Sequence, residues 1–170
     1  MSIKFAILTV SDRSSSGARE DRSGPLLQQA VIDSGWEVIQ TDIISDEFSE
    51  IVDILQTWSD TGEINVILTT GGTGFSPRDI TPEATKTVVD RQAPGLAEAM
   101  RAGSLSITPH AMLSRAEAGI RKKTLIVNLP GSPKGALENF RIVAPVLPHA
   151  VQLLEGDSEA EETHQRPLAA

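Results

Sequence analysis

The sequence predicts an α/β fold, a three-layer sandwich in which a mostly parallel central sheet is flanked by helices. Apolar runs of strand length alternate with segments of helical periodicity along most of the 170 residues. Strands separated by helical segments join through right-handed crossovers, which produces a parallel sheet between helix layers. Hydrophobic residues make up 39% of the chain and aromatic residues only 4%, so the core is expected to be aliphatic.

The first half predicts two strands and two helices. Phe5–Val10 is a continuous apolar run, typical of a buried strand, and the polar loop Ser11–Gly24 follows it. Apolar residues then recur at helical spacing up to the stop signal at Gly35, namely Leu26, Leu27, Ala30 and Val31. Trp36–Ile44 predicts the second strand. The next helix has apolar residues at i, i+3, i+4 and i+7, namely Ile51, Ile54, Leu55 and Trp58.

The second half continues the alternation. Val66–Leu68 predicts a third strand, and Pro82 suits the first turn of a helix. Leu96–Leu105 is compatible with another helix, and Leu125–Leu129 is a short buried strand. The last helical pattern runs from Leu137 to Leu154 and is interrupted by two prolines, Pro145 and Pro148, which predict a kink or a broken pair of helices.

One domain is expected over residues 1–155, with a disordered acidic tail over 156–170. The tail contains four acidic residues against one arginine and has no apolar periodicity.

Each conspicuous polar or glycine-rich loop follows a predicted strand. These loops are Ser11–Arg13, Ser45–Glu47, Thr69–Gly74 and Asn128–Pro133. Because ligands of such sheets bind outside the carboxyl ends of the strands, the four loops are expected to meet at one rim.

The loop Thr69–Gly74 has the composition of an anion-binding loop, since its glycines allow close approach of backbone N–H groups to a ligand. It is not a dinucleotide fingerprint, because Pro77 occupies the place of the third glycine, and no G-x-x-x-x-G-K-[ST] motif occurs. A glycine turn with no ligand is the alternative. A nucleotide-dependent oxidoreductase is disfavoured by the missing glycine.

Several polar residues allow two interpretations. Asp79 is either an acidic residue favoured at a helix start or a carboxylate that holds a divalent cation. Asp46 is either a helix N-cap or a second carboxylate of the pocket. Ser114–Glu117 matches a capping box, and Lys134 is either solvated or near a phosphate.

Composition excludes several classes of function. The net charge of −8 disfavours charge-driven binding to nucleic acid or anionic membranes. The absence of cysteine excludes disulfides, thiolate metal sites and a cysteine nucleophile. No apolar run approaches the roughly 20 residues of a membrane span, and a cytoplasmic protein is expected.

Five segments together form a specific signature. They are Leu8–Arg13, Leu68–Thr85, Pro94–Leu96, Met112–Ala116 and Asn128–Pro133. The most specific part is T-T-G-G-T-G at 69–74 followed by R-D-I-T-P-E at 78–83. In this order they resemble the molybdopterin adenylyltransferases, a family represented also by the pterin-binding G domains of gephyrin and plant molybdenum-cofactor proteins.

The resemblance implies a homotrimer that transfers AMP from Mg-ATP to the terminal phosphate of molybdopterin and releases pyrophosphate, in molybdenum cofactor biosynthesis. Mn²⁺ is an alternative to Mg²⁺, and other proteins of that biosynthesis are possible partners. The two essential aspartates of the family correspond to Asp46 and Asp79, implied to be catalytic and to bind the metal. The implied binding residues are Ser11, Asp12, Gly71, Gly72, Thr73, Gly74, Ser114, Arg115, Pro130, Gly131 and Ser132. A non-catalytic molybdopterin-binding or scaffold module of the same fold is the alternative function.

Overall fold

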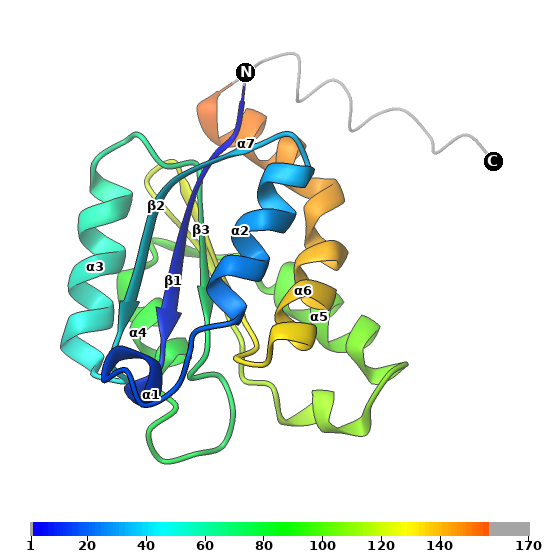
Figure 1. Cartoon of the computed structure of the whole chain (residues 1–170). Helices are drawn as coiled ribbons and strands as arrows, with labels where there is room; N and C mark the ends of the chain where they lie inside the picture. The colour runs from blue at the N-terminus through cyan, green and yellow to red at the C-terminus, as the bar shows by residue number, and fades with distance from the viewer. Residues whose placement is uncertain (1, 157–170) are drawn as a thin grey trace.

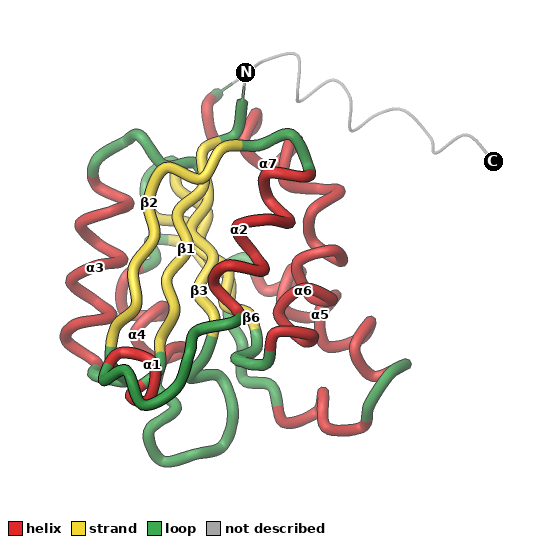
Figure 2. Tube along the Cα trace, in the orientation of Figure 1, coloured by secondary structure: helices red, strands yellow, loops and turns green. Residues whose placement is uncertain are grey.

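A mixed β-sheet lies between two layers of helices (Figures 1 and 2). The computed structural model describes residues 2–156. Within them the elements are β1 (Lys4–Val10), α1 (Asp12–Ser15), α2 (Ser23–Asp33), β2 (Glu37–Ile44), α3 (Phe48–Asp60), β3 (Val66–Thr70), α4 (Thr81–Val88), β4 (Arg91–Gln92), α5 (Pro94–Leu105), the 3₁₀ helix η1 (Pro109–Leu113), β5 (Ala118–Arg121), β6 (Thr124–Leu129), α6 (Pro133–Val143), η2 (Ala144–Val146) and α7 (Leu147–Glu155).

The strand order is β2-β1-β3-β6-β5-β4. β2, β1, β3 and β6 run parallel, so their carboxyl ends share one edge of the sheet. β5 pairs antiparallel with β6, and β4 antiparallel with β5. The α/β sandwich with a mostly parallel sheet is therefore confirmed, with an antiparallel extension at one side.

Alternate residues of β1 supply the cores on the two faces of the sheet. Phe5 and Ile7 belong to the core under α2, α5, α6 and α7, whereas Ala6, Leu8 and Val10 belong to the core under α3 and α4. Figure 1 shows these two helix layers on opposite sides of the sheet. Because successive side chains of β1 point to opposite faces and both faces are buried, β1 is a continuous apolar run.

The scarce aromatic residues are concentrated on one face. Phe5 stacks on Trp36 with ring centroids 5.2 Å apart, and Phe140 approaches both rings edge-on at 6.5 and 6.3 Å. This cluster joins β1, α6 and the residue that precedes β2. Apart from Trp58 on the other face, the remaining buried hydrophobic core is almost entirely aliphatic, as the composition predicts.

The last helical region is broken where the prolines predict. α6 ends at Val143, a short 3₁₀ turn contains Pro145, and α7 restarts with Pro148 in its first turn.

Two strands have no sequence signal of their own. β4 is two exposed residues, and β5 has a glycine in place of an apolar side chain at its second position. A Cβ on Gly119 would collide with the side chain of Val89, which follows α4. The close packing of β5 against the end of α4 therefore requires the glycine. The capping box predicted at Ser114–Glu117 is wrong, because Ser114 ends η1 and the following residues form no helix.

No helix within the described range is long and apolar enough to cross a membrane. The acidic tail predicted for 156–170 lies outside the described residues except for Gly156, which ends α7 in a left-handed conformation.

Candidate functional site

A cleft opens at the carboxyl ends of the parallel strands. The chain passes from β1 to β2 on one side and later to β3 on the other, so the strand order reverses next to β1. Ligands bind at such a reversal in open α/β sheets. The cleft there has a volume of about 890 Å³ and is lined by residues that follow β1, β2, β3 and β6. Four loops therefore meet at one rim, as the sequence predicts.

The floor of the cleft is a glycine turn after β3. Gly71 has φ of 104°, and a Cβ there would collide with the carbonyl oxygen of Val10. The Thr81 hydroxyl donates to the Gly71 carbonyl at 3.0 Å, and the Thr81 N–H donates to the Gly72 carbonyl at 3.1 Å. The turn thus connects the strand end directly to the start of α4.

Asp46 is held by a reciprocal pair of hydrogen bonds with Asp12. The Asp12 N–H donates to Asp46 Oδ2 at 2.8 Å, and the Asp46 N–H donates to Asp12 Oδ1 at 2.9 Å. Asp46 does not cap α3, since Glu47 occupies the N-cap position. Of the two interpretations of Asp46, its position in the cleft supports the pocket carboxylate.

The local charges act differently on these two carboxyls. Burial raises the pKa of Asp46 above its ordinary value, and the nearby charges of Asp12 and Asp79 raise it further. The hydrogen bond from the Asp12 N–H and the charge of Arg78 oppose this rise only in part. Hydrogen bonds from the Arg78 guanidinium and from the Asp46 N–H lower the pKa of Asp12. Asp46 is therefore a desolvated carboxyl that would gain from a bound cation.

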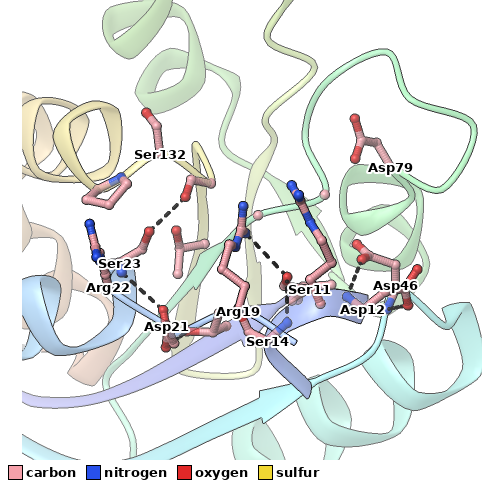
Figure 3. A pocket seen from close by; sticks show the side chains of 18 of the residues that line it. Ser11, Asp12, Ser14, Arg19, Asp21, Arg22, Ser23, Asp46, Asp79 and Ser132 are labelled. Carbon is pink, nitrogen blue, oxygen red and sulfur yellow. Dashed lines mark hydrogen bonds between the residues drawn. The ribbon is translucent and has the colours of Figure 1, made fainter. Parts of the chain in front are cut away.

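Asp79 reaches the cleft from the loop between β3 and α4. Its Oδ2 accepts from the Ser76 N–H at 2.9 Å, and its own N–H donates to the Ser76 carbonyl at 2.9 Å. Figure 3 shows Asp79 and Asp46 at the same end of the cleft, with Arg22, Ser23 and Ser132 at the other end.

Three consecutive backbone N–H groups of the glycine loop, Gly71–Gly74, have no hydrogen-bond acceptor in the described part of the chain. Within residues 2–156, the N–H groups of Gly72, Thr73 and Gly74 donate to no protein acceptor. Successive unpaired N–H groups in a turn that includes a left-handed residue make an anion-binding concavity. Gly72, at φ of 66°, supplies that residue.

A second cleft, of about 520 Å³, adjoins the first. It lies among the glycine loop, α5, η1 and α6, and its walls include Phe75, Met100 and Leu113. The two clefts share Gly72, Asp79, Gly131 and Ser132. A ligand with two large parts can therefore occupy both clefts, with its connecting group at the glycine loop and Asp79.

The donor set suits a magnesium ion that arrives with a phosphate ligand. No group of three or more His, Cys, Asp or Glu side chains within the described residues is arranged to hold a metal ion. Asp46 and Asp79 nevertheless each keep one carboxylate oxygen, Oδ1, without a hydrogen bond in this part of the chain. Mg²⁺ is commonly held by one or two carboxylates together with substrate phosphates and water.

The predicted site residues occupy three kinds of place. The first cleft is lined by Ser11, Asp12, Asp46, Gly71, Gly72, Asp79, Gly131 and Ser132. The second cleft is lined by Gly72, Thr73, Gly74, Asp79, Ser114, Pro130, Gly131 and Ser132. Arg115 lines neither cleft; its guanidinium binds the glycine loop from outside. Lys134 pairs with Glu138 at 3.8 Å, and its side chain is 80% exposed.

Sequence reasoning did not single out several residues that line the clefts. Asp21 accepts from the Thr9 hydroxyl and from the N–H groups of Ser23 and Gly24, and the Ser23 hydroxyl donates to the Gly131 carbonyl. The aspartate just before a helical pattern was an available signal. Arg101 and Asn139, in the second cleft, lie on helix faces that carry no comparable signal.

The chain is similar over most of its length to several known proteins. The family model described as "Probable molybdopterin binding domain" matches residues 6–149. "Molybdopterin adenylyltransferase" of Helicobacter pylori strain J99 is 42% identical, over 91% of this chain and 89% of that protein. "Molybdenum cofactor synthesis protein cinnamon" of Drosophila melanogaster is 43% identical over 96% of this chain, which spans only 28% of that protein. The crystal structure of the molybdopterin biosynthesis enzyme MoaB from Thermus thermophilus superposes with a TM-score of 0.86 at 47% identity, covering 91% of this chain and 98% of that one.

Proposed function

The chain belongs to the molybdopterin binding domain family, and we propose that it is a nucleotidyltransferase that moves AMP from ATP to the terminal phosphate of molybdopterin. Relatives of similar length bear the name of this activity, and the match covers most of both chains. The reaction belongs to the biosynthesis of the molybdenum cofactor.

One observation carries the proposal. The carboxylate of Asp79 and the unpaired N–H of Gly72 lie where the two clefts join, and the carboxylate of Asp46 lines the first cleft beside them. Adenylyl transfer needs sites for two large substrates whose phosphates react between them, and the paired clefts supply this arrangement. A dinucleotide oxidoreductase would not require carboxylates at that junction.

The reaction needs positioning and charge stabilisation rather than a protein nucleophile. A phosphate oxygen of molybdopterin attacks the α-phosphorus of ATP in line. The new P–O bond forms as the bond to the β-phosphate oxygen breaks, and pyrophosphate leaves with that oxygen. The absence of cysteine is consistent with this direct transfer.

Each group in the site has a task in this scheme. The N–H groups of Gly72, Thr73 and Gly74 donate to phosphate oxygens at the junction. Asp46 and Asp79 would hold Mg²⁺, or Mn²⁺ in its place, and the bound ion would offset the charge of the phosphates. Asp12 orients Asp46 through their reciprocal hydrogen bonds.

The proposal extends to assembly and location. A homotrimer in the cytoplasm, in contact with other proteins of molybdenum cofactor biosynthesis, is the expected setting. Light scattering should then give three times the 18.2 kDa chain mass.

The test compares Asp79→Asn and Asp46→Asn with the wild type in AMP transfer at saturating ATP and Mg²⁺. Each change removes a negative charge that would hold the cation, so turnover should fall by about 10²–10³-fold while molybdopterin still binds. Asp42→Asn is the matched control, because Asp42 is exposed on β2 and lines neither cleft.

Normal turnover in Asp79→Asn would contradict the metal role of that residue. A wild type that binds molybdopterin tightly and transfers no AMP would identify the chain as the non-catalytic module.

A further inference from the structure

Arg115 fastens the loop that carries Asp79. Its Nε donates to the Gly74 carbonyl at 2.7 Å, its Nη2 donates to the Asp79 carbonyl at 2.6 Å, and its Nη1 pairs with Glu83. The Arg115 N–H also donates to the Thr73 carbonyl at 2.9 Å. One residue from the segment after η1 therefore binds both ends of the Gly74–Asp79 loop and the first turn of α4.

These contacts hold together the two ends of the loop, Gly74 and Asp79, which we call its neck. Between the two carbonyls held by Arg115, the chain passes through the exposed residue Phe75 and returns to Asp79. Figure 1 shows this connection between β3 and α4 projecting beyond the strand ends. A Cβ on Gly74 would lie 2.9 Å from Asp79 Oδ2, so the two ends of the loop touch.

The arginine within the loop, Arg78, lines the first cleft and makes a different set of contacts. Arg78 binds both carboxylate oxygens of Asp12 at 3.0 Å and pairs with Glu47 at 2.7 Å, but these are contacts between half-exposed side chains. Arg115 instead binds backbone carbonyls, and its side chain is 33% exposed. The position of the Asp79 main chain therefore depends on Arg115 more directly than on Arg78.

The guanidinium of Arg115 is not placed to contact a ligand. It lines neither cleft, and all three of its nitrogens already bind the loop or α4. We propose that Arg115 is a positioning residue, which sets the Asp79 carboxylate in the cleft by holding the Gly74 and Asp79 carbonyls together. Only the expected effect of Arg115 on turnover rests on the proposed function; its effect on the loop does not.

Lysine cannot replace this arginine. A guanidinium donates in several fixed directions from one plane, whereas an ammonium is a single point of charge on a flexible stem. Arg115→Lys keeps the charge but cannot span two carbonyls and Glu83 together. The neck should open, and Asp79 should lose its fixed place.

The experiment measures Arg115→Lys and the matched control Arg121→Lys beside the wild type. Arg121 also binds a backbone carbonyl and a carboxylate, those of Val88 and Asp60, but lies away from the clefts. Three quantities are followed: hydrogen exchange of the peptide that contains Ser76 and Asp79, the Kd for molybdopterin, and kcat for AMP transfer.

The positioning role predicts a specific pattern. In Arg115→Lys the exchange of this peptide accelerates, because the Ser76 and Asp79 N–H groups lose their partners in the turn. kcat falls by about 10- to 100-fold, as for a misplaced catalytic group, and the Kd stays unchanged. Arg121→Lys changes neither the exchange of this peptide nor kcat.

Two results would overturn the inference. One is unchanged exchange of the loop in Arg115→Lys. The other is a Kd for molybdopterin that weakens by as large a factor as kcat falls, which marks a direct ligand contact. If Arg115→Lys does not fold, Arg115→Gln takes its place, because a single amide cannot bind both carbonyls, and unchanged loop exchange in that variant also overturns the inference. If the wild type transfers no AMP, the proposed function fails, and the exchange data still decide whether Arg115 holds the loop.

Discussion

At the residue scale, the site depends on a few positions whose environment is set by distant parts of the chain. Asp46 illustrates this. Its sequence neighbours make it a natural N-cap of the following helix, and local pattern alone left that interpretation open. The structure instead pairs it with Asp12, 34 residues earlier, and this pairing exists only because β1 and β2 lie side by side. A helix cap is predicted from neighbouring residues alone, so this contact between distant residues could not be predicted in that way.

Gly71 gives a prediction at the same scale. Gly71→Ala should cost about 1–2 kcal/mol for a left-handed conformation, plus the cost of a collision with the Val10 main chain. Because the collision pushes β3 away from the end of β1, AMP transfer should fall as well. Urea unfolding and the transfer assay measure the two effects.

Gly35→Ala is the control for this prediction. Gly35 has φ of 80° but no atom near its Cβ position, so only the conformational cost applies there. Equal losses of unfolding free energy in the two variants would show that the contact at Val10 has no effect.

At the element scale, the strands with both faces buried and the edge strand β2 were predictable, whereas β4 and β5 were not. β1, β3 and β6 are apolar runs because helices cover both of their faces. β4 and β5 lie at the margin of the sheet and have neither an apolar run nor a clear alternation. They form because β6 offers an antiparallel partner after a tight turn, in which Lys122 has φ of 52°.

Ion pairs join the end of α3 to that turn and make an acid-sensitive contact. Asp60 pairs with Arg121 and Lys122, each at 2.9 Å, and these hydrogen bonds lower the pKa of Asp60 from 3.8 to about 2. A lowered pKa means that the contribution to stability is complete above pH 3.8 and is lost as the pH falls through about 2.

Asp60→Asn should therefore lower the urea midpoint at neutral pH, and its difference from the wild type should shrink as the pH falls from about 3.8 to about 2. Urea titrations at a series of pH values measure this difference. Asp53→Asn, an exposed change on the same helix, should show no such trend. A difference for Asp60→Asn that stays constant down to pH 2 would argue against the ion pairs as its cause.

At the scale of the whole molecule, the site lies next to β1, where the strand order reverses. The alternation of strands and helices was enough to predict that the loops meet at the carboxyl ends of the parallel strands. The alternation does not show that the rim holds two joined clefts. The second cleft is closed by α5, η1 and α6, which come from the far half of the chain and have no local signature of binding.

The residues that line the two clefts all lie between Thr9 and Asn139, so the chain beyond Gly156 should not be needed for catalysis. A variant that ends at Gly156 should keep the kcat and the melting temperature of the full chain. A loss of AMP transfer in that variant would assign a catalytic role to the last 14 residues and contradict a domain limited to residues 1–155.

The central claim is that the junction of the clefts joins AMP to molybdopterin. The most direct measurement is an anaerobic reaction of the full chain with molybdopterin, Mg²⁺ and ATP labelled on the α-phosphate. The label should appear in a molybdopterin adduct, with one pyrophosphate released for each adduct formed. Label that stays in ATP while molybdopterin is bound, or that appears only as free AMP, would contradict the claim.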